Sequence, residues 1–391
     1  MVSVVVFLLV LGLLVLIHEF GHFIAAKKSG VLVEEFGIGF PPRIWGKRIG
    51  ETIYSINAIP LGGFVKLFGE EYAELEKNGK TAGGSLKKRA FVFKPHYQKA
   101  IIVLAGVIMN TLLGVSIYYA LLSTNNFQSD PIPLLAPYSF RFGTQEGRVV
   151  ATNILPGSPA AKSGISAEDI IEQYQVGDTI NENGWIQITS ANQLITTIKS
   201  ALGKNVFLKV ENYRNGERRV ISVSPYYNKE LKRAVIGINL LDTVILKYRS
   251  GNQKLFSGFM HSYNIMGYNF STIGQLVQLA VREKRIEPVS QTVSGPIGIY
   301  SVVNDLVTTS GQKMVKNLLN IIGLLSLSLA VMNVLPLPAL DGGRLVFILY
   351  EWITGRRVNK TLERNVNLVG FLVIISLGIL VSINDIVRIF K

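Results

Sequence analysis

Four long apolar runs alternate with polar segments along the chain. They cover residues 2–26, 100–122, 317–340 and 366–387, and each exceeds the roughly 18 residues that a helix needs to cross a bilayer. The first run has no basic leader and carries HEFGH where a signal-peptide cleavage site would lie, so we expect it to be retained. The pattern predicts a polytopic α-helical membrane protein with four transmembrane helices.

The segments between these runs show other periods. Residues 33–70 alternate apolar and aromatic residues and are interrupted by Gly and Pro. This pattern predicts a membrane-associated β-hairpin region. Residues 135–245 combine a helical pattern at 190–202 with two alternating runs joined around Asn215-Gly216, which predicts a compact α/β module. Residues 252–285 repeat apolar positions at helical spacing but hold too many polar ones to span, which predicts an amphipathic helix on the outer membrane surface.

These patterns give a predicted domain organisation. The boundaries are 1–27 for the first span, 28–98 for the cytoplasmic, membrane-associated β-region with a mobile loop, 99–122 for the second span, 123–250 for an extracytoplasmic linker and α/β module, 251–316 for the amphipathic juxtamembrane segment, 317–340 for a third span with a broken end, 341–365 for a cytoplasmic loop, and 366–391 for the fourth span and tail.

Basic residues indicate the orientation in the membrane. The net charge is +14, and thirteen Lys and Arg residues lie in 27–99. The segment between the last two spans adds Arg344, Arg356, Arg357, Lys360 and Arg364. The positive-inside rule places both segments in the cytoplasm and residues 123–316 outside. Topology and anionic lipid account for this charge, so we expect no nucleic-acid partner. Cysteine is absent, so the external segment folds without disulfides.

Three ionisable residues interrupt the first span. His18 and His22 are four residues apart, so they share one face of a helix, and Glu19 lies beside them. This HExxH spacing presents two imidazoles to zinc and a glutamate to the water at the metal. On a soluble helix a chance occurrence would be the better interpretation. Inside a membrane, ionisable groups are costly enough that we expect a functional site holding one zinc ion per chain.

A catalytic zinc site needs a third protein ligand and an open position. Asp341 follows the third run, which has no other acid back to Asp305. His18 lies roughly 26 Å along the first helix, and Asp341 comes about 24 residues into the third segment, so both reach the same cytoplasmic depth. Pro336 and Pro338 interrupt the helix, and broken backbone at membrane depth is tolerated where it lines a wet cavity. The alternative, Asp341 as a helix cap, leaves zinc without its third ligand.

Asn333 stands just before the break. Its amide is placed to donate a hydrogen bond to the oxyanion of a tetrahedral intermediate. The alternative is that it caps the broken helix ends, because buried backbone groups must be paired.

The chain resembles the site-2 protease family of intramembrane zinc metalloproteases, in its bacterial four-span, PDZ-containing branch of regulator of sigma-E protease-like members. The resemblance rests on HEFGH, on LDGGR after the broken third span, and on a PDZ-like insert between the second and third spans. It implies zinc ligands His18, His22 and Asp341, with Glu19 as general base. It also implies that Asn333 engages substrate, and that PLGGFVKLFGE, with Gly62 and Gly63, offers a strand edge to substrate. SGPIGI at 294–299 is similar to a further family segment.

The resemblance also implies a substrate class and a location. The substrates would be membrane-spanning proteins already trimmed by another protease, such as anti-sigma factors or remnant signal peptides, cleaved within the lipid bilayer. The enzyme would lie in the bacterial inner membrane, with its active site near the cytoplasmic side and its PDZ-like domain outside. That domain would act either as a size-exclusion gate or as a peptide receptor, and the sequence leaves both open.

Two stretches depart from the family pattern. Val107 replaces the proline of Gly-Pro-x-x-Asn in the second span, while Gly106 and Asn110 are kept. Asn110 is then either a polar contact between spans or a substrate contact. In the PDZ-like module, Asp169 and Asp178 each match the expected aspartate, so the alignment over 166–184 stays open.

Two other functions compete with the protease. A catalytically silent scaffold with a PDZ-like partner-binding module would not need Glu19, whose presence therefore weighs against it. A zinc-dependent transporter would carry polar residues through several spans, whereas here they gather at one depth.

Overall fold

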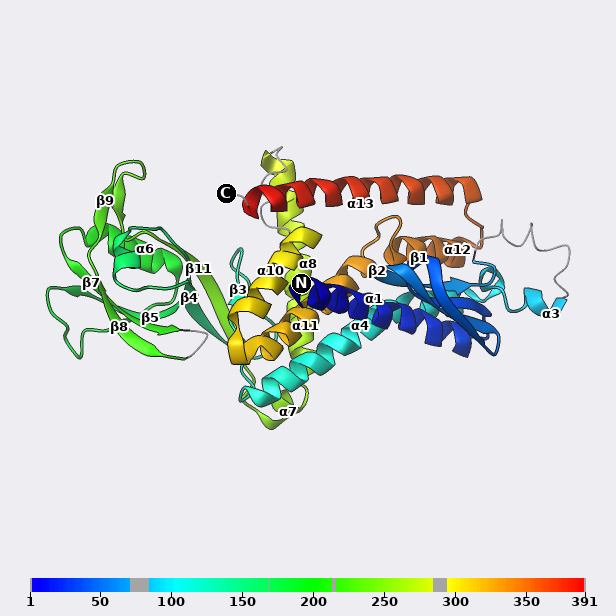
Figure 1. Cartoon of the computed structure of the whole chain (residues 1–391), viewed down its shortest axis with the longest axis horizontal. Helices are drawn as coiled ribbons and strands as arrows, with labels where there is room; N and C mark the ends of the chain where they lie inside the picture. The colour runs from blue at the N-terminus through cyan, green and yellow to red at the C-terminus, as the bar shows by residue number, and fades with distance from the viewer. Residues whose placement is uncertain (1, 71–83, 168, 213–215, 284–293, 390–391) are drawn as a thin grey trace. The chain divides into compact units, whose positions relative to one another are not determined.

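The computed structural model describes residues 2–70, 84–167, 169–212, 216–283 and 294–389 (Figure 1). The chain folds as two compact units, Met1–Ala120 with His261–Lys391 and Leu121–Met260. We call the first the helical unit and the second the sheet unit. Asn215 of the predicted hairpin and residues 284–285 of the predicted amphipathic helix lie outside the described residues.

Long apolar helices form the helical unit. Among the described residues, four are long and apolar enough to cross a membrane: α1 (Val2–Lys28), α4 (His96–Thr124), α11 (Met314–Val334) and α13 (Lys360–Ile389). Large apolar side chains of α13 are exposed, including Phe371 and Leu372. Such exposure suits contact with lipid rather than water. The prediction of a multi-pass membrane protein is confirmed.

The other described helices of this unit lie between these spans in the sequence. They are α3 (Gly84–Lys87), η1 (Phe91–Phe93), α10 (Pro296–Thr309), η2 (Gly311–Lys313) and α12 (Asp341–Thr354), and α8 (Ser257–Glu283) enters the unit from His261 onward. The predicted loop 341–365 therefore contains a helix, which ends at Thr354 and is followed by Gly355 in the left-handed conformation, φ +67°. The SGPIGI segment starts α10, where Asp385 of α13 accepts hydrogen bonds from the backbone N–H groups of Gly295 and Gly298.

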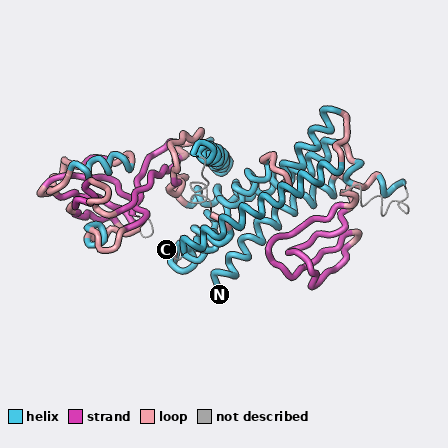
Figure 2. Tube along the Cα trace, turned by 90° about the horizontal axis from the view of Figure 1, so that it is seen from above, coloured by secondary structure: helices cyan, strands magenta, loops and turns pink. Residues whose placement is uncertain are grey.

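Two long strands bend to form a small sheet in the same unit. β1 (Val33–Ile49) and β2 (Thr52–Leu67) are antiparallel. Residues 33–38 pair on one side with 63–67 and on the other with 53–56, while 43–49 pair with 52–57. This sheet is the magenta trace beside the helices in Figure 2. Residues 63–67 consequently form one edge of it.

The sheet unit is built on antiparallel strands. Within its described residues, a seven-stranded sheet has the order β3-β11-β4-β5-β7-β8, with β6 paired to β5. The elements of the whole sheet unit, in chain order, are β3 (Ile132–Pro133), β4 (Thr144–Ile154), α5 (Pro159–Lys162), β5 (Asp169–Gly177), β6 (Ile186–Gln187), α6 (Ala191–Ser200), β7 (Asn205–Asn212), β8 (Arg218–Val223), β9 (Tyr226–Asn228), β10 (Arg233–Val235), β11 (Ile238–Lys247) and α7 (Gly251–Leu255).

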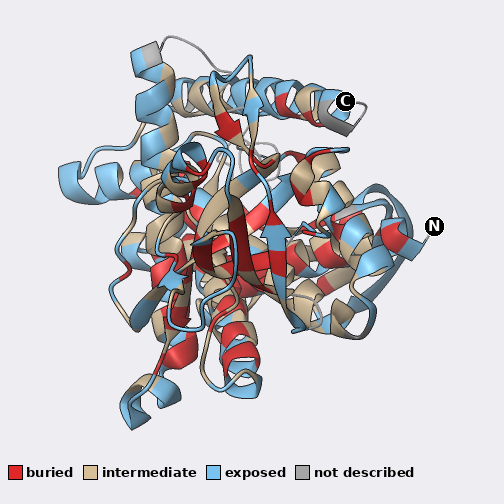
Figure 3. Cartoon of the chain, turned by 90° about the vertical axis from the view of Figure 1, so that its left-hand side faces the viewer, coloured by how far each residue is buried: buried red, intermediate tan, exposed pale blue. Residues whose placement is uncertain are grey.

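The core of the sheet unit lies between α6 and the sheet. Leu194 and Ile198 of α6 pack with Ile171 and Leu208, and buried residues mark the strands in red in Figure 3. Asp169 is fully buried at the start of β5, where it accepts hydrogen bonds from several donors, among them the Arg219 guanidinium. The unit is thus an α/β module with an apolar core.

Candidate metal centre

The first span presents His18, Glu19 and His22 on α1, where α4 comes close. A Cβ atom on Gly21 would lie 2.3 Å from the Ala105 carbonyl oxygen, so this glycine permits the close helix contact. A Cβ atom on Gly106 would lie 2.6 Å from both the His18 Cε1 and His22 Nε2 atoms. The two imidazoles therefore occupy the space that a larger residue at position 106 would fill.

The loop between α11 and α12 brings Asp341 to the same place. Cβ atoms on Gly342 and Gly343 would lie 2.0 Å and 2.4 Å from the carbonyl oxygens of Leu335 and Leu337. The glycines thus allow the loop to fold tightly against the start of α12. Leu340, not Asp341, is the N-cap, and no side chain caps this helix. The carboxylate of Asp341 instead faces the histidines.

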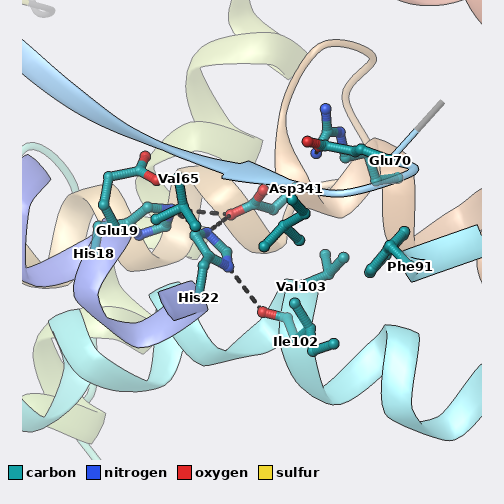
Figure 4. A pocket seen from close by; sticks show the side chains of 11 residues that line it. His18, Glu19, His22, Val65, Glu70, Phe91, Ile102, Val103 and Asp341 are labelled. Atoms are coloured by element: carbon teal, nitrogen blue, oxygen red, sulfur yellow. Dashed lines mark hydrogen bonds and ion pairs between the residues drawn. The ribbon is translucent and has the colours of Figure 1, made fainter. Parts of the chain in front are cut away.

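Three donor atoms converge at this point (Figure 4). Asp341 Oδ2 lies 2.9 Å from His18 Nε2 and 3.2 Å from His22 Nε2, and the two Nε2 atoms are 3.1 Å apart. All three lie within 4.8 Å of one another. Two imidazole nitrogens and one carboxylate oxygen are the donor set of a three-ligand catalytic zinc site. Their chemistry and spacing therefore fit such an ion.

Each histidine has a second polar neighbour. His22 Nδ1–H donates to the Ile102 carbonyl oxygen at 2.8 Å, which leaves the Nε2 lone pair of a neutral ring for a metal. His18 Nδ1 lies 3.3 Å from the amide of Asn110, which is fully buried. The Oδ1 atom of Asn110 has no hydrogen-bond partner among the described residues.

A cavity of about 120 Å³ adjoins the donors. Glu19 lines it together with the two histidines and Asp341. The remaining lining residues are Val65, Leu67, Glu70, Phe91, Ile102, Val103 and Arg344. A carboxylate beside a three-donor centre, with room for water, is the arrangement of a hydrolytic metal site.

Comparison with known proteins agrees with this chemistry. The model of peptidase family M50 matches residues 6–377. A Clostridium acetobutylicum protein whose name is that of a zinc metalloprotease is 31% identical, over 98% of this chain and 97% of the relative. The zinc metalloprotease RasP of Oceanobacillus iheyensis is 29% identical over 100% of both chains, and the regulator of sigma-W protease RasP of Bacillus subtilis is 26% identical over 99% of both.

The chain belongs to peptidase family M50, the site-2 proteases. It is therefore a metalloprotease, as the resemblance implied. Its membership covers both units, because the matched residues run from α1 into α13.

The structure of this M50 peptidase brings together only some of the predicted site residues. His18, Glu19, His22 and Asp341 line one cavity, and Asn110 lies against His18. A Cβ atom on Gly63 would lie 3.7 Å from Glu19 Cγ, whereas one on Gly62 would meet the Phe40 ring at 2.8 Å. Asn333 is buried near the end of α11 and is not among the residues that line the cavity.

Other residues of the M50 site were not expected from the sequence. Glu70 and Arg344 form an ion pair and both line the metal cavity, as does Phe91. Arg344 directly follows Asp341-Gly-Gly, but its charge was interpreted only as a sign of topology. Its position one helical turn after a candidate ligand was the signal available.

The edge of the small sheet also reaches the M50 site. Residues 63–67 pair with β1 on one side, and within the described residues no strand pairs with their other side. Val65 and Leu67 of this segment line the metal cavity. An unpaired strand edge thus lies beside Glu19.

Proposed function

We propose that this M50 metalloprotease is an intramembrane endopeptidase that binds one zinc ion per chain through His18, His22 and Asp341. The observation that carries the proposal is the convergence of these three donors, from α1 and from the start of α12, within 4.8 Å of one another. When bound, zinc supplies a Lewis acid that polarises the scissile carbonyl and makes water a better nucleophile. Its relatives named zinc metalloproteases support the choice of metal.

Glu19 is the general base of the proposed reaction. Its side chain lines the same cavity as the three donors, and it belongs to the helical turn that holds both histidines. It accepts a proton from the attacking water and passes it to the leaving amine when the peptide bond breaks. A silent scaffold would have no use for a carboxylate at this position.

Substrate binds, in this proposal, as an added strand. A peptide bond in a transmembrane helix is shielded by its own hydrogen bonds, so the helix must unwind before hydrolysis. The open edge at 63–67 offers backbone donors and acceptors to the unwound chain by β-augmentation. Gly63 lies next to Glu19, so a strand on this edge passes the general base. Gly62, directly before this edge, acts with it by leaving room for the Phe40 ring.

Asn110 fixes the tautomer of His18 in the proposed zinc site. With Nε2 as the metal ligand, Nδ1 carries the proton and must donate it. In an Asn side chain, the hydrogen-bond network decides which of the two amide positions is the oxygen and which is the nitrogen. An Asn110 amide turned so that Oδ1 faces His18 accepts that hydrogen bond and also satisfies its own unpaired oxygen. We therefore assign Asn110 to the support of a ligand rather than to substrate contact.

The substrates we propose are membrane-spanning proteins trimmed beforehand by another protease, such as anti-sigma factors or remnant signal peptides. A relative named as the regulator of sigma-W protease supports this class. Asn333, at the end of α11, steadies the unwound substrate or the oxyanion. We also propose, from the distribution of basic residues, that the site lies near the cytoplasmic face of the bacterial inner membrane and that the sheet unit lies outside as a PDZ-like gate or receptor.

Glu19→Gln tests the proposed function. We expect it to abolish cleavage of a membrane-tethered reporter helix, because the amide cannot accept the proton from water. Zinc content, measured on the same purified protein, should stay near that of the wild type, since Glu19 is not a ligand. Cleavage at the wild-type rate by the variant would overturn the assignment and favour a scaffold.

A further inference from the structure

A second, larger cavity adjoins the metal cavity. It has a volume of about 430 Å³ and lies among α4, α12 and the start of α13. Four residues line both cavities: Glu70, Phe91, Val103 and Arg344. The two spaces therefore share a boundary, and an ion pair, Glu70 with Arg344, is part of it.

The larger cavity contains several charged and polar side chains among apolar ones. Lys99 and Glu351 form a second ion pair in it, with Nζ and Oε2 3.0 Å apart, and only 7% of the Lys99 side chain is exposed. Glu351 also accepts a hydrogen bond from the Val358 backbone N–H. Arg364 and Asn367 contribute further polar groups from α13. Lys99 is thus already neutralised, and its ammonium is held in place.

Arg344 differs from Lys99 in its freedom to change partner. About half of its side chain, 53%, is exposed, and its guanidinium contacts the Glu70 carboxylate from a position one helical turn after Asp341. Among the described residues that line the metal cavity, it is the one Arg or Lys side chain. Glu19, Glu70 and Asp341 are the carboxylates there.

Peptide hydrolysis in this cavity would create one more carboxylate. The oxygen of water bonds to the carbonyl carbon, the C–N bond breaks, the amine takes a proton, and the acyl fragment leaves as a carboxylate. Asp341 is a proposed metal ligand and Glu70 is paired with Arg344, so Glu19 is the carboxylate that repels the product, because like charges in a partly desolvated site interact strongly. A guanidinium binds a carboxylate through two parallel N–H···O hydrogen bonds.

We propose that Arg344 is the binding site for the new C-terminal carboxylate of the cleaved product, and that Glu70 is the resident carboxylate that competes with it. In this proposal Glu70 pairs with Arg344 until a product carboxylate displaces it. Exchange of Glu70 for product, and back, moves the product carboxylate away from Glu19 toward the larger cavity. The proposal rests on the proposed function, because it needs a carboxylate to form here.

Paired peptides test the proposal by binding. The probes are a fluorescent apolar peptide with a free C-terminal carboxylate and the same peptide as a C-terminal amide. Their dissociation constants are measured by anisotropy on the full, zinc-loaded chain in detergent micelles. For the wild type we expect the acid to bind about tenfold more tightly than the amide, as one charge-assisted bidentate contact allows.

Variants identify the group responsible. Arg344→Ala should bring the acid-to-amide preference down about tenfold, and Glu70→Gln should raise it, because the competing charge is gone. Arg218→Ala is the matched control. Arg218 pairs with Glu211 at 3.0 Å on the surface of the sheet unit, so its loss removes the same charge without touching the cavity.

Each outcome decides one point. An unchanged preference in Arg344→Ala shows that the metal alone holds the carboxylate and overturns the proposal. An unchanged or lower preference in Glu70→Gln overturns the competition. If Arg344→Ala fails to fold, the near-isosteric Glu70→Gln still decides, together with Arg344→Lys, which should keep part of the preference. Cleavage by the same wild-type preparation is measured in parallel. Absence of cleavage by the wild type would refute the proposed function. An acid-to-amide preference that differs from the expected one, in a preparation that cleaves, would refute only this inference.

Discussion

The helical unit and the sheet unit distribute polar and apolar side chains in opposite ways. In the sheet unit most of the fully buried residues are apolar, as Leu194 and Leu208 show, and buried Asp169 is paired with Arg219. In the helical unit Asn110 and Ser326 are fully buried, while Leu372 of α13 is 54% exposed. One unit hides its apolar groups from water, and the other hides polar groups from lipid.

This difference identifies which polar residues carry function. Burial of apolar surface in water stabilises the sheet unit, but it gives no driving force between helices that already lie in hydrocarbon. Polar groups among such helices are costly unless they are partnered. Two of the polar residues buried in the helical unit lie next to His18 or its neighbour: Asn110 contacts the His18 ring, and Ser326 donates to the Asn110 carbonyl oxygen at 2.8 Å. We therefore attribute this pair to the metal centre.

Loss of a ligand should give the largest effect. Asp341→Ala should lower zinc affinity by more than about a hundredfold, because even the loss of a ligand's supporting hydrogen bond costs roughly 10–100-fold. Competition with a chelator of known affinity measures it. Asp385→Asn is the matched control: this acid is also buried in the helical unit, but it binds the start of α10. Equal zinc affinity in Asp341→Ala and the wild type would remove Asp341 from the site.

The sheet unit should respond to the opposite kind of change. Leu194→Ala should lower the free energy of unfolding of that unit by about 2–5 kcal/mol, because it leaves a cavity in a packed apolar core. Leu372→Ala removes the same atoms from an exposed position of α13 and should change the free energy of unfolding of the helical unit by less than about 0.5 kcal/mol. Urea titration of the full chain in micelles, followed by limited proteolysis of each unit, compares the two variants. Equal costs would contradict the contrast between the units.

Support of His18 should matter less than a ligand. Asn110→Leu should weaken zinc binding by about 10–100-fold, since His18 Nδ1–H loses its acceptor. Ser326→Ala removes a hydrogen bond to the backbone of the same residue and should leave zinc affinity close to that of the wild type. If both variants bind zinc equally well, Asn110 is a contact between helices and not a support for the metal.

The central part of the site was predictable because it depends on helix geometry. A spacing of four residues placed His18 and His22 on one face of a helix. Counting residues along two spans placed Asp341 at the same depth in the membrane. The structure has these three donors within 4.8 Å of one another. Asn333 was expected at the reacting atoms because it stands just before the break, and in the structure it is buried near the end of α11 without lining the cavity, so its contact with substrate stays a proposal. Depth alone does not fix the direction of a side chain.

The surroundings of the site depend on tertiary contacts that the hydrophobic periodicity of the sequence does not predict. The strand pattern over 33–70 predicted strands, but not that β1 and β2 bend so that 63–67 become an edge beside Glu19. Glu70 and Arg344 lie 274 positions apart in the sequence, and only the fold joins them. Gly106 was noted as part of a motif, whereas its function here is to leave space for two imidazoles.

The smallest predicted effect concerns a charge cluster at the turn between β1 and β2. Hydrogen bonds from Arg89 and Lys27 hold the pKa of the Glu51 carboxyl below its ordinary value. A lowered pKa means that the ionised form stabilises the fold above the ordinary pKa, and that this contribution is lost as the pH falls through the lowered pKa. Because the group is 37% exposed, solvent screens the pairs, and Glu51→Gln should cost at most about 1 kcal/mol at neutral pH. The difference from wild type in thermal unfolding should shrink on acidification below about pH 4, where unfolded glutamate is protonated. A difference that grows on acidification would show that Glu51 is not held in its charged form, and that the turn is stabilised by packing alone.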